Sequence, residues 1–211
     1  MAGNPAAAAG TNIAVSAAAA ASGGLAHARA GRVDWRVVAW MAPPSVAAAF
    51  VGGLFGGRVP ERLLLAAIAA VVFWNGLDLL VELRGPREGG GSPRLAAALA
   101  GSVIGLLGGA VGLILGTLRL PALLGPIGLS AYRAVGTNLV VGFVLGLAGF
   151  LGHLVRLEVE WLVLAVSLAG ALPGAWLGAR YTGRLSERAL RRAIGAVLLA
   201  VAAAIAVAAA G

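Results

Sequence analysis

Cysteine and lysine are absent from this 211-residue chain, and charged residues of every kind are scarce. Without cysteine the chain contains no disulfide and no thiolate metal site. Only 11% of the residues are charged, whereas soluble domains carry about 25%. A soluble protein of this length has too much surface to cover with so few charges. This composition therefore excludes a disordered chain, a disulfide scaffold and a typical soluble enzyme.

Apolar residues make up 60% of the chain, and the mean hydropathy is +0.95. This composition predicts a multi-pass membrane protein, an all-α transmembrane bundle of about seven spans. The first run is mostly alanine and depends on packing against its neighbours. The runs cover residues 11–27, 37–56, 63–83, 95–118, 134–155, 159–180 and 189–209.

The basic residues outnumber the acidic ones by 16 to 8, which gives a net charge of +8. The arginines lie singly or in small clusters between the apolar runs, as expected for loops at a membrane surface rather than for a nucleic-acid interface. The expected partners are therefore the lipid bilayer and a small substrate, and a homo-oligomer is compatible with them. No Ser/His/Asp set, phosphate loop or paired-carboxylate motif is present, so we expect neither an enzyme nor a cofactor.

The chain repeats itself at an offset of 126 residues. Residues 10–80 match residues 136–206 without a gap, with 22 identities in 71 positions. The repeat predicts a first half at 1–83, a Gly/Pro/Arg linker at 84–94 and a second half at 95–211. The counterpart of run 95–118 would precede residue 1, so the repeat predicts a first half that is incomplete at its N-terminus.

Repeated halves that meet near the membrane midplane are typical of secondary transporters. If run 95–118 crosses the membrane once, the halves are parallel; if residues 95–133 enter and return, the halves are inverted. The alternative to a transporter is a membrane scaffold that moves nothing, or an inactive truncated permease.

Glycines are dense between Gly101 and Gly112. A broken helix there would offer backbone groups to a substrate at Gly108, Gly109 and Gly112. The alternative is close helix packing through small residues such as Gly101 and Gly105.

A Gly-Thr-Asn triplet occurs in each half, and we interpret both triplets as starts of spans. Helix N-termini carry free N–H groups and a positive dipole end, which suit an anion. The two N-termini would face each other across the symmetry axis, although simple helix capping explains each triplet equally well. Arg133 would attract the anion toward the site, and an ordinary loop charge is the equal alternative. The predicted substrate-binding residues of these segments are Thr11, Asn12, Arg133, Gly136, Thr137 and Asn138.

Three titratable residues within or beside the spans are candidates for proton coupling: His27, His153 and Asp78. The alternative for the two histidines is an interfacial position without a proton-transfer role. Neither has a nearby Cys, Asp or Glu at ligand spacing, so no metal site is expected.

Five segments resemble the sulfite exporter TauE/SafE family, also called the toluene-sulfonate uptake permeases. They are the glycine-rich run with its Leu-Pro at 101–121, and residues 134–138, 149–153, 172–180 and 184–188. The resemblance implies an inner-membrane permease for small anions such as sulfite, sulfonates or related organosulfur compounds. Our mechanistic hypothesis is alternating access by movement between the two halves. Two features depart from the family pattern: the first glycine-rich segment is absent, and the central one is loose at residues 108–112. Arg119 is also unexpected so close to the Leu-Pro.

Overall fold

The computed structural model describes residues 5–54, 61–81, 93–111, 116–155 and 159–210. Within these ranges the chain forms eight helices and no strand, in agreement with the predicted all-α membrane bundle. The helices are α1 (Pro5–Arg29), α2 (Trp35–Leu54), α3 (Glu61–Val81), α4 (Pro93–Val111), α5 (Gly116–Leu124), α6 (Ala131–Val155), α7 (Trp161–Thr182) and α8 (Glu187–Ala210).

The helices follow from the apolar runs, because a backbone surrounded by lipid must satisfy its hydrogen bonds within the same segment. Three described segments are long and apolar enough to cross a membrane, namely Ala131–Leu151, Trp161–Thr182 and Glu187–Val207. Two shorter apolar helices are Leu65–Val81 and Arg94–Gly108. Most helices begin and end a few residues away from the predicted runs, as expected for boundaries read from a sequence.

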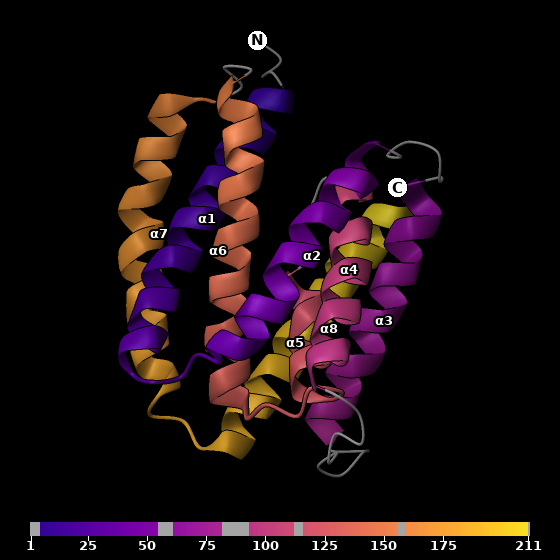
Figure 1. The fold of residues 1–211 in the computed structure, drawn as a ribbon, viewed down its shortest axis with the longest axis vertical. Coiled ribbons are helices and arrows are strands. Elements are labelled where there is room, and N and C mark those ends of the chain that lie inside the picture. The colour runs from indigo at the N-terminus through magenta and orange to yellow at the C-terminus, as the bar shows by residue number, and fades with distance from the viewer. Residues whose placement is uncertain (1–4, 55–60, 82–92, 112–115, 156–158, 211) are drawn as a thin grey trace.

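The helices form two bundles (Figure 1). One bundle consists of α1, α6 and α7, with α1 packed along both others. The second bundle contains the pairs α2–α4 and α3–α8, with α5 among them. Helix α6 contacts α2, α5 and α8 and so joins the bundles. Each bundle contains helices from both predicted halves.

Helices that correspond in the repeat run antiparallel. Near one end of the α1–α6 pair, a Cβ on Gly23 would lie 3.1 Å from Leu139. Near the other end, a Cβ on Gly149 would lie 3.5 Å from Ile13. These contacts are reciprocal, since Gly149 and Leu139 lie 126 residues after Gly23 and Ile13. Helices α3 and α8 are also antiparallel, as Figure 1 shows. The repeats are therefore inverted.

The inversion follows from the course of residues 93–124. Run 95–118 does not cross once, because α4, which ends at Val111, and α5, which begins at Gly116, run in opposite directions (Figure 1). Helix α4 runs parallel to α2: Gly101 packs on Met41, and Gly105 packs on Ser45. Helix α5 then leads back to the end at which α4 began (Figure 1). The chain thus enters and returns, which is the second of the two predicted arrangements.

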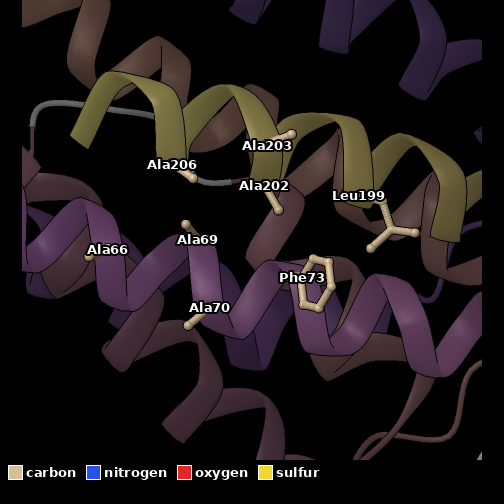
Figure 2. A pocket seen from close by; sticks show the side chains of 8 residues that line it. All are labelled: Ala66, Ala69, Ala70, Phe73, Leu199, Ala202, Ala203 and Ala206. Atoms are coloured by element: carbon tan, nitrogen blue, oxygen red, sulfur yellow. The ribbon is translucent and has the colours of Figure 1, made fainter. Parts of the chain in front are cut away.

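The antiparallel pair α3–α8 leaves a shallow apolar groove on its surface (Figure 2). The groove is lined almost entirely by alanine, with Phe73 and Leu199 as the large side chains. Small side chains allow membrane helices to approach closely. Helices α3 and α8 approach closely at Gly76 and Gly195. A Cβ on Gly76 would lie 3.0 Å from the Gly195 carbonyl oxygen.

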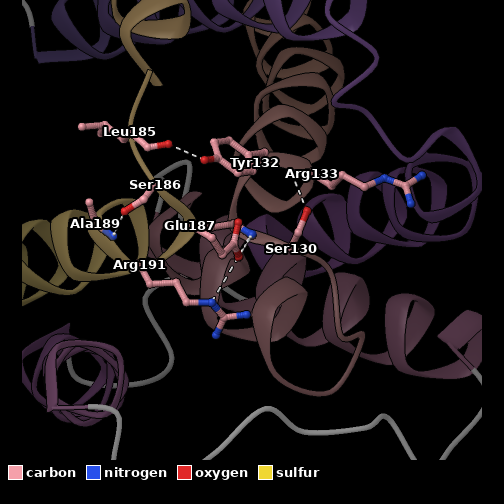
Figure 3. Close-up of polar contacts among 9 residues, drawn as sticks. Ser130, Tyr132, Arg133, Leu185, Ser186, Glu187, Ala189 and Arg191 are labelled. Carbon is pink, nitrogen blue, oxygen red and sulfur yellow. Dashed lines mark hydrogen bonds and ion pairs between the residues drawn. The ribbon is translucent and has the colours of Figure 1, made fainter. Parts of the chain in front are cut away.

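Polar contacts fix the beginning of α6 against the turn between α7 and α8 (Figure 3). The first backbone N–H of α6, at Ala131, donates to Glu187 Oε1 at 2.6 Å. The hydroxyl of Tyr132 donates to the Leu185 carbonyl. Glu187 also accepts from Arg191 at 3.2 Å. An acidic side chain of α8 therefore satisfies an otherwise free N–H at the start of α6.

Candidate functional site

A buried arginine lies where the two bundles meet. Arg119 projects from the short helix α5 and is 1% exposed, and it is among the largest fully buried side chains. Its Nε donates to Oδ1 of Asn138 on α6 at 2.9 Å. The interaction joins α5 to α6, and α5 also contacts α3 and α4 of the second bundle.

Two glycines make room for the guanidinium. A Cβ on Gly116 would lie 3.3 Å from Nη2 of Arg119, and a Cβ on Gly142 would lie 3.1 Å from the same atom. Both distances are shorter than ordinary van der Waals contact. Gly142 also faces Ala20 of α1, so the guanidinium lies among α5, α6 and α1.

The charge of Arg119 has no counter-charge in the described part of the chain. Within that part, its guanidinium donates to the neutral side-chain amide of Asn138, and Nη1 has no hydrogen-bond partner. Removing an ion from water costs several kcal/mol unless another charge compensates it. Ionisable groups within membrane proteins commonly mark the path of a substrate or ion. This environment is suited to binding a small anion through charge-assisted hydrogen bonds.

The Gly-Thr-Asn triplets occupy different positions from those predicted. Helix α1 begins at Pro5 and α6 at Ala131, so Gly10 and Gly136 lie in the second turn of their helices. The prediction that the triplets cap helix N-termini is therefore wrong. The two triplets also lie near opposite ends of the antiparallel α1–α6 pair and do not face each other. The structure brings Asn138, but not Asn12, to Arg119.

The two threonines make reciprocal structural contacts. Thr137 is fully buried, and its Oγ1 accepts from the backbone N–H of Asp34, just before α2. Thr11 is 4% exposed, and its Oγ1 accepts from the N–H of Glu160, the N-cap of α7. Glu160 lies 126 residues after Asp34. Each threonine thus fixes the start of a helix in the other half.

Gly136 is a packing position. A Cβ there would meet the Arg32 carbonyl and would lie 3.0 Å from Cβ of His27. Arg133 lies away from Arg119: its guanidinium pairs with Asp34 at 3.1 Å, and its side chain is 50% exposed. Gly136 and Arg133 therefore both have structural partners near the beginning of α6.

Within the described part of the chain, no hydrogen bond or ion pair joins the remaining predicted residues to Arg119. His27 is buried at the end of α1, and neither ring nitrogen has a hydrogen-bond partner. Asp78 lies in α3, which packs along α8. His153 is in the last turn of α6, but its side chain is outside the described part of the chain.

In the glycine-rich segment, the packing interpretation holds for Gly101 and Gly105, which contact α2 directly. Gly108 is buried and Gly109 follows it in α4, whereas Gly112 lies outside the described residues.

Reasoning from sequence did not select Arg119 as a candidate site residue, although a signal was present. It is an isolated arginine in a long apolar stretch, seven residues beyond the glycine-rich segment and two before Pro121. An ionisable residue in such a place points to function by default.

Comparisons with known proteins agree with this architecture. The family model described as "Sulfite exporter TauE/SafE" matches residues 1–205. A "Probable membrane transporter protein" of Haemophilus influenzae (strain ATCC 51907 / DSM 11121 / KW20 / Rd) is 25% identical over 130 residues. That match covers 61% of this chain and 49% of the relative, so the chain spans about half the length of the curated relative that it matches. No solved structure matches the chain. Because the family model covers nearly every residue, this chain belongs to the sulfite exporter TauE/SafE family.

Proposed function

We propose that this chain is a permease of the inner membrane that moves small anions, and that Arg119 and Asn138 form part of the anion site. The single observation that carries the proposal is the buried Arg119 guanidinium, whose charge no described carboxylate compensates. An oxyanion beside Nη1 would supply the missing counter-charge and accept the unused hydrogen bond. Sulfite and sulfonates, the substrates that the family resemblance implies, are anions of this kind.

The position of the site between the bundles supports alternating access. Arg119 belongs to the bundle of α2, α3, α4, α5 and α8, whereas Asn138 belongs to the bundle of α1, α6 and α7. Rocking of one bundle against the other would open the site to one side of the membrane at a time. The inverted repeat provides two similar arrangements for such a movement.

The distribution of arginine suggests the orientation. One end of the molecule, here called the arginine-rich end, contains the last residues of α1 and α7 and the first residues of α2, α4, α6 and α8. Arg62 lies at the opposite end, at the start of α3. By the positive-inside rule we assign the arginine-rich end to the cytoplasm. The described arginines near that end are Arg29, Arg32, Arg36, Arg94, Arg133, Arg180, Arg184, Arg188, Arg191 and Arg192.

Flux measurements test the proposal. The purified full chain is reconstituted into liposomes, and uptake of labelled sulfite and of methanesulfonate is followed under an imposed anion gradient. We expect uptake above that of protein-free liposomes. A hydrogen bond to a charged group contributes about 1.5–3 kcal/mol, so Arg119→Gln should lower uptake by about 10- to 100-fold.

Arg184→Gln is the matched control, because it removes an arginine that is exposed and lies over the Tyr181 ring. This variant should retain uptake. The proposal fails if the wild-type chain moves neither anion, or if Arg119→Gln transports as well as Arg184→Gln does.

A further inference from the structure

A second cationic site lies at the arginine-rich end, where α1 and α7 run side by side (Figure 1). A surface cavity of about 340 Å³ opens there between the two helices. Three arginines, three alanines and one tryptophan line it, and no acidic residue does: Ala26, Arg29, Ala30, Arg32, Trp176, Ala179 and Arg180. We name this cavity the α1–α7 groove.

Aromatic rings and a carbonyl hold two of the three arginines in place. The guanidinium of Arg29 lies over the Trp176 ring, 5.3 Å from its centre. The guanidinium of Arg32 lies 5.7 Å from the centre of the Tyr132 ring, and its Nη1 is 3.5 Å from the Ala179 carbonyl oxygen. Stacking of this kind orients a guanidinium without neutralising its charge.

No carboxylate in the described part of the chain pairs with any of these three arginines. The acidic side chain nearest in sequence is Asp34, which pairs with Arg133 and accepts from the N–H groups that begin α2. The groove therefore presents three positive charges, two of them oriented, to whatever enters it. Arginine binds phosphate oxygens through planar, bidentate hydrogen bonds.

The groove lies on the outer wall of the α1–α6–α7 bundle, away from Arg119. On α1, His27 packs towards Gly136 of α6, whereas Ala26 and Arg29, with Ala30 just after the helix, line the groove. Helix α7 is the most exposed of the candidate spans, and little of it is buried. Its outer surface is therefore available to lipid.

We propose that the α1–α7 groove binds the phosphate of an anionic phospholipid from the leaflet at the arginine-rich end. Basic pockets between transmembrane helices on the cytoplasmic side suit acidic lipid headgroups. Trp176 lies at the level where tryptophan commonly anchors a protein to the membrane interface. Exposed apolar side chains of α7, such as Leu172 and Leu177, face the acyl chains. A lipid meets both the charged groove and this apolar wall, whereas a free anion in water meets only the groove.

The test measures lipid binding directly. The purified full chain is titrated with phosphatidylglycerol or phosphatidylcholine in mixed micelles, and bound lipid is counted by native mass spectrometry. We expect tighter binding of phosphatidylglycerol. Each arginine near a membrane surface contributes about 1 kcal/mol to attraction of anionic lipid. The double variant Arg29→Gln, Arg180→Gln should therefore bind phosphatidylglycerol about 30-fold more weakly.

The matched control is Arg36→Gln, Arg94→Gln, which removes the same charge from the same end but from α2 and α4. This control should bind phosphatidylglycerol like the wild type. The Arg29→Lys, Arg180→Lys variant should retain part of the binding, because it keeps the charge. Equal losses in both Gln double variants would mean general attraction and would overturn the proposal. It would also be overturned if inorganic phosphate competed with phosphatidylglycerol at equal concentration, since the ligand would then be a soluble anion.

Discussion

The close contact between α2 and α4 makes a specific prediction for Gly101→Ala. A Cβ at position 101 would lie 2.6 Å from the carbonyl oxygen of Met41 and 2.7 Å from Oγ of Ser45. The tightest ordinary contact is about 3.4 Å, so α2 and α4 must separate by about 0.8 Å to admit the methyl group. The Met41 carbonyl is backbone and also accepts from the Ser45 hydroxyl at 2.7 Å, so no flexible side chain can move aside.

Extra atoms in a well-packed core cost about 1–3 kcal/mol. Gly178→Ala is the matched control, because a Cβ at Gly178 has nothing within 4 Å and gains the same helix propensity. We expect the melting temperature of Gly101→Ala to lie roughly 2–12 °C below that of Gly178→Ala. The measurement is thermal unfolding of both purified variants in one detergent. Equal melting temperatures would show that α2 and α4 do not pack as closely as described.

Substitutions at three further positions should change the free energy of unfolding by different amounts. Arg119→Met should raise the stability by about 1–4 kcal/mol while abolishing anion uptake, because it replaces an uncompensated buried charge with an apolar chain; a loss of stability in denaturant unfolding would contradict this. Thr137→Val should cost about 1–3 kcal/mol, since the Asp34 N–H loses its acceptor, and Thr137→Ser should restore it; the same unfolding curves compare the two variants. Asp34→Asn should cost under about 1 kcal/mol, because its ion-pair partner Arg133 is half exposed and asparagine still accepts from the N–H groups that begin α2, and a larger cost in thermal unfolding would contradict this weak ion pair.

The repeat in the sequence predicted the internal symmetry, because equivalent residues make equivalent contacts. Gly23 and Gly149 each admit an apolar side chain of the opposite half, and Thr11 and Thr137 each accept from a backbone N–H of the opposite half. The direction of the repeats could not be predicted. It depends on whether the apolar run after the linker crosses or returns, and hydropathy is the same for both courses.

The candidate site was predicted only in part. Asn138 was selected as an anion-binding residue at a helix N-terminus, whereas in the structure its side chain bonds to Arg119 from the second turn of α6. The misplacement arose because the residues before each triplet also join the helix: Pro5 is tolerated at a first helical position, and Ala131 gains a partner in the distant Glu187. Local sequence contains no information about such a tertiary partner.

Equilibrium binding of an anion distinguishes a site at Arg119, which the structure favours, from a site at Arg133, which the sequence predicted. Isothermal titration of methanesulfonate into the purified full chain is compared among the wild type, Arg119→Gln and Arg133→Gln. Arg119 is buried without a counter-charge, whereas Arg133 is half exposed and paired with Asp34. We expect the wild type and Arg133→Gln to bind with similar affinity, and Arg119→Gln to bind about 10- to 100-fold more weakly. Unchanged affinity in Arg119→Gln, or a comparable loss in Arg133→Gln, would contradict an anion site at Arg119.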